Sequence, residues 1–334
     1  MLNFSGYTNA AISLSNNVTA DFQGTVDPNG TTLAIGELSG VSSSRLLGGT
    51  ATNGEVLTWS IGGNNTDATF AGQIAEQNIN ANTAIQKIGT GKWTLSGSNS
   101  YNGGTLVSGG TLLVNNTSGS ATGSGDVEVA GGATLGGTGA INSSVAVDAT
   151  GTFAPGNPTG ALSIGTDLNC DATANLQFAL GTSSSSVTVA GNLSLAGNLA
   201  VTNAPGFGAG SYTLFTYSGA LNFSGIAIVS APSGYTYTVN TNTPGQVKLI
   251  VQSTAPLGPP VFGGISLNGG NFILSGTGGV ANTTYYLLGS TNLGSPLNSW
   301  TRLLTNQFDA GGNFLFTNVL DATAGQQFYL LQLP

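Results

Sequence analysis

The chain has 334 residues, of which 40% are hydrophobic and only 5% are charged. A globular domain ordinarily carries about 25% charged residues, so Ser, Thr, Asn and backbone amides must keep this chain soluble. The net charge of −8, with only five Lys and Arg residues, excludes the clustered cations that nucleic acids or anionic membranes require. Cys170 is the only cysteine and histidine is absent, which excludes intrachain disulfides and ordinary zinc or copper sites. We therefore expect no cofactor.

No apolar run approaches the roughly 20 residues that a membrane span needs, so we expect no membrane insertion. The first residues show neither a basic n-region nor an apolar h-region, so no signal peptide is visible. The composition nevertheless resembles that of extracellular proteins. We expect a mature chain, an excised piece or another route of export.

Short runs that alternate apolar and polar residues recur along residues 1–252, and Gly, Asn, Ser or Pro separates them. This pattern predicts β-strands, and helical spacing is nowhere sustained. The expected strands include 92–96, 105–108, 111–114, 126–129, 133–135, 144–147, 151–153, 162–164, 176–180, 186–189 and 193–195.

Strands spaced in this way suit either a β-sandwich or a β-solenoid. Two features favour the solenoid: the phrases GGTLLV, GGATLGG and AGNLSLAGNLAV repeat imperfectly, and the turns lack the strict two-residue Asn-Gly pattern of hairpins. Stacked coils also explain the low charge, because like charges would repel along a ladder whereas Ser, Thr and Asn can bond along it. At roughly 22 residues per coil we expect about 11 coils. The residues expected to point inward are Leu95, Leu112, Val127, Val129, Val145, Val147, Leu193 and Leu195.

The composition changes at residues 253–260, where three prolines fall within five residues and predict a stiff linker. Residues 261–334 are richer in aromatics, and their spacing predicts about six antiparallel strands in a small β-sandwich. We expect this domain to cover the C-terminal end of the solenoid. Its expected core residues are Tyr286, Leu288, Trp300, Leu303, Phe316 and Tyr329.

Residues 87–113 closely resemble the autotransporter-associated β-strand repeat of Gram-negative surface and secreted proteins. The repeat opens on Lys-x-Gly-x-Gly, continues as Thr-Leu-Ser-Gly-x-Asn-x-Tyr and Gly-Gly-Thr, and closes on Gly-Gly-Thr-Leu. Trp93, Asn102 and Leu106 depart from the usual residues without interrupting the strand pattern. The matching residues are Lys87, Gly89, Gly91, Thr94, Leu95, Ser96, Gly97, Asn99, Tyr101, Gly103, Gly104, Thr105, Gly109, Gly110, Thr111 and Leu112.

The resemblance implies a right-handed parallel β-helix over residues 1–252, in a protein located outside the cell or on its surface. It does not extend to the large translocator barrel that ends an autotransporter, because residues 261–334 look instead like the short C-terminal β-domain of some secreted proteins. Our leading interpretation is a non-catalytic structural or adhesive rod that presents polar faces to a matrix, an extracellular polysaccharide or other copies of itself. The alternatives are a polysaccharide lyase or hydrolase, or a sugar-binding protein, on the same scaffold.

The enzyme alternative needs positioned carboxylates. Asp126 and Glu128 lie at i and i+2 of an expected strand and so share one face, but no basic residue accompanies them in sequence. We expect solvated surface residues there, with weak cation or glycan contact as the candidate role. Without histidine the usual Ser-His pair cannot form. Trp59 and Trp93 could be stacking platforms for sugars, although such residues more often fill a core.

A solenoid leaves unpaired N–H and C=O groups on its first and last coils, and such edges recruit other strands. The chain begins as a strand with neither charge nor proline around Leu2 and Phe4. We expect this first coil either to be truncated from a longer array or to dock head to tail on another copy. Leu2 and Phe4 form the candidate assembly edge.

Overall fold

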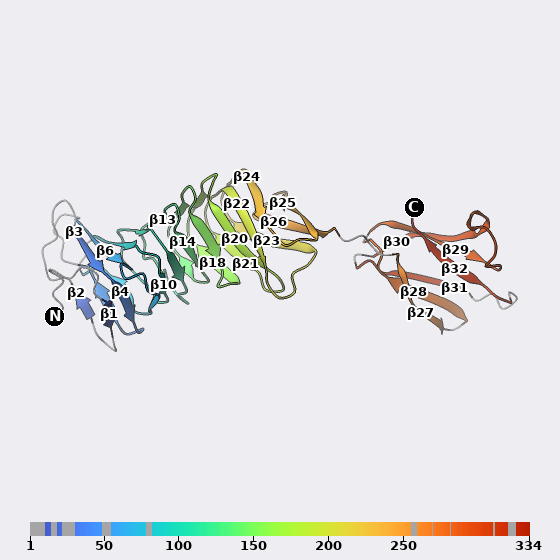
Figure 1. Cartoon of the computed structure of the whole chain (residues 1–334), viewed down its shortest axis with the longest axis horizontal. Coiled ribbons are helices and arrows are strands. Elements are labelled where there is room, and N and C mark those ends of the chain that lie inside the picture. The colour runs from blue at the N-terminus through green and yellow to red at the C-terminus, as the bar shows by residue number, and fades with distance from the viewer. Residues whose placement is uncertain are drawn as a thin grey trace. The chain divides into compact units, whose positions relative to one another are not determined.

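The computed structural model describes residues 11–14, 19–21, 31–48, 55–77, 82–254, 259–268, 270–280, 282–309, 311–319 and 325–334. The regular secondary structure of the described residues is all β-strand apart from one 3₁₀ turn at Leu297–Ser299. The chain divides into two compact units, Met1–Thr254 and Ala255–Pro334. Figure 1 shows the strands of each unit.

The first unit is a parallel β-solenoid, as the sequence predicts, and its largest sheet follows two ladders of parallel strands. One ladder pairs successive strands β1 (Ala11–Leu14), β4 (Glu37–Gly40), β7 (Ala68–Phe70), β10 (Lys92–Leu95), β12 (Thr111–Val114), β14 (Thr134–Gly137), β17 (Thr152–Pro155), β20 (Asn175–Leu180), β22 (Leu193–Asn203) and β24 (Leu221–Ser230). The other pairs β3 (Thr31–Ile35), β6 (Val56–Ile61), β9 (Asn82–Lys87), β11 (Thr105–Val107), β13 (Val127–Val129), β16 (Val145–Val147), β19 (Leu168–Cys170) and the start of β22.

Two shorter parallel sheets complete the coils. The first contains β2 (Thr19–Asp21), β5 (Arg45–Leu47) and β8 (Gln73–Ala75), and the second begins with β15 (Ala140–Ile141), β18 (Gly160–Ile164), β21 (Ser185–Val189) and β23 (Gly210–Tyr217).

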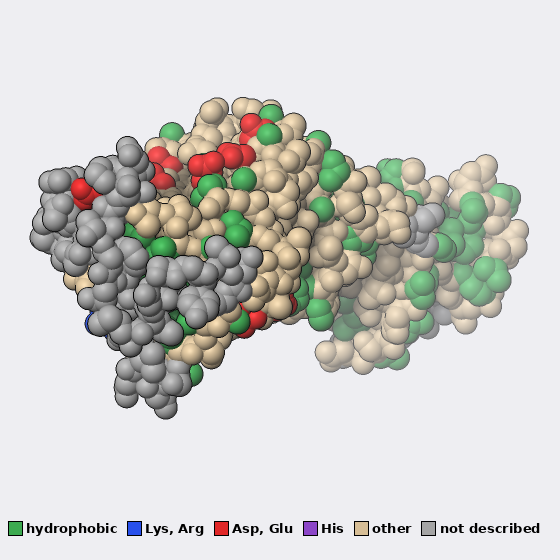
Figure 2. All heavy atoms as spheres, turned by 60° about the vertical axis from the view of Figure 1, so that its left-hand side comes forward, with side chains coloured by type: hydrophobic (Ala, Val, Ile, Leu, Met, Phe, Trp, Pro, Cys, Tyr) green, Lys and Arg blue, Asp and Glu red, His purple; other side chains and the backbone are tan. Residues whose placement is uncertain are grey.

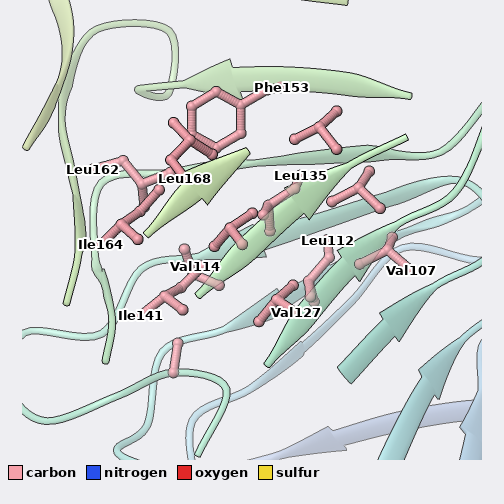
Figure 3. Close-up of a cluster of buried hydrophobic side chains, with 14 of the residues drawn as sticks. Val107, Leu112, Val114, Val127, Leu135, Ile141, Phe153, Leu162, Ile164 and Leu168 are labelled. Carbon is pink, nitrogen blue, oxygen red and sulfur yellow. The ribbon is translucent and has the colours of Figure 1, made fainter. Parts of the chain in front are cut away.

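The interior is a continuous column of apolar side chains that stack from coil to coil (Figure 3). Leu112 lies opposite Leu135, which in turn lies opposite Phe153, and all three side chains are fully buried. Successive strand residues point to opposite faces, which explains why alternation in the sequence identified this column correctly. All eight side chains expected to point inward are buried.

The solenoid has about 8 turns within the described residues, whereas a coil of roughly 22 residues led us to expect about 11. Coil length varies, as the parallel pairs Leu135–Phe153 and Gly40–Phe70 show. The estimate was also too high because the last part of this unit does not coil.

The last strands of the solenoid unit pair antiparallel, which the sequence pattern did not predict. β26 (Gln246–Ser253) lies between β23 and β25 (Tyr235–Asn240), and it is antiparallel to both. Most pairing in residues 1–252 is still parallel. Parallel and antiparallel strands share the same two-residue period, so alternation alone could not distinguish them here.

The second unit contains two three-stranded antiparallel sheets, consistent with the expected small sandwich. One sheet orders β27 (Val261–Asn268), β28 (Asn271–Thr277) and β31 (Phe314–Val319). The other orders β30 (Thr301–Gln307), β29 (Thr284–Ser290) and β32 (Phe328–Gln332). Part of the predicted linker, residues 255–258, lies outside the described residues.

The core of the second unit is only partly the one expected. Leu288 and Phe316 are buried, and Tyr329 packs against the core cluster. The other three predictions were wrong: Leu303 is 40% exposed, and Tyr286 and Trp300 are only half-buried. Tyr285 and Leu287 are buried instead of Tyr286. The run Tyr-Tyr-Leu-Leu has no alternation from which the inward face could be read.

Candidate functional site

A shallow groove of about 660 Å³ runs along the second ladder of the solenoid. Strands β6, β9, β11, β13, β16 and β19 all contribute outward side chains to it, so the groove crosses several coils. The lining residues are Thr32, Thr58, Ala84, Ile85, Gln86, Gly103, Gly104, Thr105, Leu106, Asp126, Val127, Glu128, Ser144, Val145, Ala146 and Asn169.

Asp126 and Glu128 both line this groove, as their i and i+2 spacing predicts, and both are exposed. Among the residues that the structure describes, they are the only ionisable ones that line the groove. Glu128 lies between Leu106 of the preceding coil and Ala146 of the following coil. In Figure 2, several Asp and Glu side chains lie along one edge of the solenoid.

Asp126 also has a structural contact, because its Oδ1 accepts a hydrogen bond from the backbone N–H of Ser144 at 3.2 Å. The same inter-coil contact recurs where Asp67 Oδ1 accepts from Lys92 N–H at 2.8 Å and Asp167 Oδ1 accepts from Asn192 N–H at 2.6 Å. Side-chain oxygens of turn residues therefore join successive coils.

Asp67 shows the electrostatic consequence of this arrangement. The hydrogen bond from the Lys92 backbone, together with its ammonium 3.2 Å from Oδ2, lowers the pKa of Asp67. Within the described residues there is no group of three or more His, Cys, Asp or Glu side chains that could hold a metal ion. Among the described residues, the groove carries two carboxylates beside its hydroxyl and amide groups, and no lysine or arginine lines it.

The other candidate residues have different outcomes. Leu2 and Phe4, the candidate assembly edge, lie outside the described residues. Trp59 and Trp93 are buried in the solenoid core, and Trp93 donates its indole N–H to the Leu38 carbonyl at 3.0 Å. Neither indole can serve as a surface platform for a sugar.

The two half-buried aromatics of the second unit, Trp300 and Tyr286, already have partners. Trp300 donates its indole N–H to the carbonyl of Ser295 at 3.0 Å. The guanidinium carbon of Arg302 lies 3.7 Å from the centre of the Tyr286 ring. Arg302 therefore covers one face of that ring.

Lys87, the first residue of the repeat motif, is a buried cation that sequence reasoning missed. Lys87 is the last of the inward-facing residues of β9. It pairs with Ile61 and Val107 in the neighbouring coils. Its side chain is 1% exposed. Its Nζ donates hydrogen bonds to the carbonyl oxygens of Ile88 at 2.7 Å, Gly89 at 3.3 Å and Gly109 at 3.1 Å. Burial lowers the pKa of Lys87 to about 8.

Asn99, also a motif residue, connects three coils. Its Oδ1 accepts from the Ile74 backbone N–H at 2.7 Å, and its Nδ2 donates to the Ala121 carbonyl. Nearby, the buried Tyr101 hydroxyl lies 2.6 Å from Thr105 Oγ1. Asn99 therefore joins the turns of neighbouring coils, whereas the Tyr101–Thr105 contact lies within one coil.

The segment that contains Lys87 and Asn99 also matches a known family. Residues 85–114 match the passenger-associated-transport-repeat. The match covers this segment alone, and the repeat together with the parallel β-solenoid is consistent with a passenger-like repeat protein of the autotransporter type. Such a passenger-like solenoid indicates a secreted surface protein of Gram-negative bacteria.

No curated protein matches the chain. No helix among the described residues is long and apolar enough to cross a membrane. The repeat motif itself was the sequence feature that could have revealed Lys87 and Asn99, because its fixed spacing reflects contacts between coils. Composition alone gives no indication of it, because lysine is rarely fully buried.

Proposed function

We propose that the protein is a non-catalytic structural or adhesive component outside the cell, whose solenoid presents its groove to an extracellular polysaccharide. The observation that carries this proposal is how the solenoid uses its carboxylates. Asp67, Asp126 and Asp167 accept backbone N–H groups of the next coil, so these acids stabilise the scaffold. Catalysis by a glycosidase needs a pair of carboxylates free for proton transfer and nucleophilic or base chemistry.

The groove itself suits the binding of an extended polymer. It crosses several coils, it is open, and it presents hydroxyl, amide and small apolar groups beside the Glu128 carboxylate. A negatively charged polysaccharide would meet two carboxylates and, among the described lining residues, no cation, which disfavours its binding. A neutral or amino-bearing polysaccharide is therefore the ligand class that we propose.

Retention of the full-length chain on a panel of immobilised extracellular polysaccharides tests this proposal. Ala146→Trp fills the groove from β16, and Ala161→Trp places the same side chain at an exposed position of β18. We expect the groove variant to bind at least about tenfold more weakly, as the loss of about 1.4 kcal/mol would produce. The β18 variant should bind as the wild type does.

The same assay separates adhesion from catalysis. An adhesive protein is retained without releasing soluble oligosaccharides from the polymer. Release of oligosaccharides that Glu128→Gln abolishes would instead identify a polysaccharide hydrolase or lyase and refute the non-catalytic role.

A further inference from the structure

The edge strand β27 has no strand on its outer side among the described residues. It pairs with β28 alone, and Figure 1 shows it at the border of its sheet. All eight of its residues, Val261–Asn268, are exposed. The strand VFGGISLN has neither charge nor proline, which are the usual features that keep an edge strand from pairing with another chain.

The side chains of β27 continue the core-facing side of the sheet. Ile265 lies opposite Leu274, and Leu267 lies opposite Phe272. Residues directly opposite each other in an antiparallel pair lie on the same face. Leu274 and Phe272 are buried at 2% and 8% exposure, whereas Ile265 and Leu267 are 70% and 67% exposed. The apolar face therefore extends beyond the part of it that is covered.

An irregularity in pairing adds a third apolar side chain to this face. The register shifts between Phe262 and Gly264, so Phe262 lies opposite the buried Gly276. Its ring contacts Phe314 of the core edge-to-face, with the ring centres 5.4 Å apart. Phe262 is nevertheless 39% exposed. We call Phe262, Ile265 and Leu267 the β27 apolar strip.

The other edge strand of the same sheet, β31, does not share this feature. Its core-facing residues Phe314 and Phe316 are 4% and 7% exposed. The facing sheet reaches at least as far as β28, where Tyr329 stacks on Phe272 with ring centres 4.8 Å apart. An edge position alone therefore does not explain the exposed strip.

We propose that the β27 apolar strip is the contact surface of a homodimer, in which β27 of one copy pairs antiparallel with β27 of a second copy. A partner that covers this strip must supply a free strand edge, apolar side chains on one face and no charge. β27 itself meets these requirements. A twofold axis perpendicular to the sheet joins the two free edges and brings both apolar strips to the same side.

Such an isologous contact closes at two copies. It differs in this respect from the head-to-tail contact expected at Leu2 and Phe4, which would propagate. The proposal goes beyond the proposed function, because it does not depend on what the groove of the solenoid binds.

Sedimentation velocity of the full chain over a range of concentrations tests the dimer. We expect monomer and dimer and no larger species. The double variant Ile265→Lys/Leu267→Lys places two charges in the contact surface, and we expect it to weaken dimerisation at least about 30-fold, the size of an interface hot-spot effect. Both side chains are largely exposed, so circular dichroism should show an unchanged fold.

Leu315→Lys is the matched control. Leu315 lies in the same sheet on β31, is 61% exposed, and pairs with Ser275 on the face opposite the core. We expect this variant to dimerise as the wild type does. If Leu315→Lys dissociates the dimer as strongly as the double variant, β27 is not the contact.

Amide hydrogen exchange supplies a second measurement that does not depend on any variant. In a β27 dimer, exchange at residues 261–268 slows as protein concentration rises. A chain that stays monomeric at every concentration overturns the proposal, as does self-association that Ile265→Lys/Leu267→Lys leaves unchanged. Slow, concentration-independent exchange at 261–268 would mean that another part of the same chain covers the strand, and would also overturn it.

Discussion

Replacement of Lys87 by methionine tests whether the motif lysine holds the coils together. Methionine keeps an unbranched apolar side chain in the core, but it cannot donate to the three carbonyl oxygens that Nζ contacts. A hydrogen bond to a charged group contributes about 1.5–3 kcal/mol to stability, and the methionine variant loses three such bonds. Part of this loss is offset, because the variant no longer has to bury and desolvate an ammonium group. We expect a loss of about 2–4 kcal/mol in the free energy of unfolding at pH 7, measured by urea denaturation with far-UV circular dichroism.

The pH dependence of this stability has a definite sign. The pKa of Lys87 falls from 10.5 in the unfolded chain to about 8 in the folded protein. Between these values the unfolded chain binds more protons, so the free energy of unfolding rises with pH. The lysine's contribution to stability is therefore smallest below pH 8 and grows by up to about 3 kcal/mol towards pH 10.5, at about 1.4 kcal/mol per unit. The methionine variant should lack this rise.

Two other buried groups act in the opposite direction at alkaline pH. Burial raises the pKa of the Cys170 thiol to about 12 and also raises that of Tyr101. The unfolded chain releases these protons first, so both groups lower stability as pH rises above their unfolded values of 9.0 and 10.0. The difference between wild type and Lys87→Met removes both contributions and isolates the lysine.

Lys92→Met is the control, since it makes the same change in the same repeat. Lys92 is 49% exposed and pairs with the 62% exposed Asp67, and a surface ion pair of this kind contributes less than about 1 kcal/mol. If Lys87→Met costs no more than Lys92→Met and its stability follows the wild-type pH profile, the inter-coil role of Lys87 is wrong.

Four further predictions concern other residues. Asn99→Ala should lower the free energy of unfolding by about 1–3 kcal/mol, because it leaves buried backbone groups in two neighbouring coils without a partner; equal urea midpoints would contradict this. Gly97→Ala should lower the melting temperature, because an added Cβ would overlap a carbonyl oxygen of the neighbouring coil. Gly208→Ala is the control: its added Cβ meets nothing within 4 Å, so the melting temperature should not change. Cys170 should react with a thiol reagent only after denaturation, since it is 7% exposed; rapid labelling of the native protein would refute its burial. Residues 257–334, expressed alone, should melt cooperatively, and a molten or aggregated fragment would show that they need the solenoid.

Much of the fold could be predicted because strand alternation reports which side chains point inward. Val127 and Val129 flank the outward Glu128, and both are buried as their positions predicted. The same reasoning placed Glu128 on the outer face together with Asp126. It could not show that Asp126 also accepts a hydrogen bond from the next coil, because that contact depends on which residues the coil length brings together.

The errors have equally specific causes. The antiparallel pairing of β26 with β23 and β25 was missed because strands of either direction share the two-residue period. Strand length does not separate them either, since the parallel strand β22 has 11 residues and β26 has 8. Lys87 was missed for another reason: charge is an unreliable guide to exposure where backbone carbonyls surround a cation and replace its water.

The solenoid separates the residues that maintain its fold from those available for function. Along one ladder the inward positions Thr105, Val127 and Val145 pair coil to coil and are all buried. The adjacent outward positions Leu106 and Glu128 pair in the same register, yet their side chains differ completely in chemistry. Substitution at an outward position leaves the backbone ladder and the apolar column intact. The outer face can therefore vary without loss of the fold, and under the proposed function the outward groove residues, such as Glu128, would determine which polysaccharide binds.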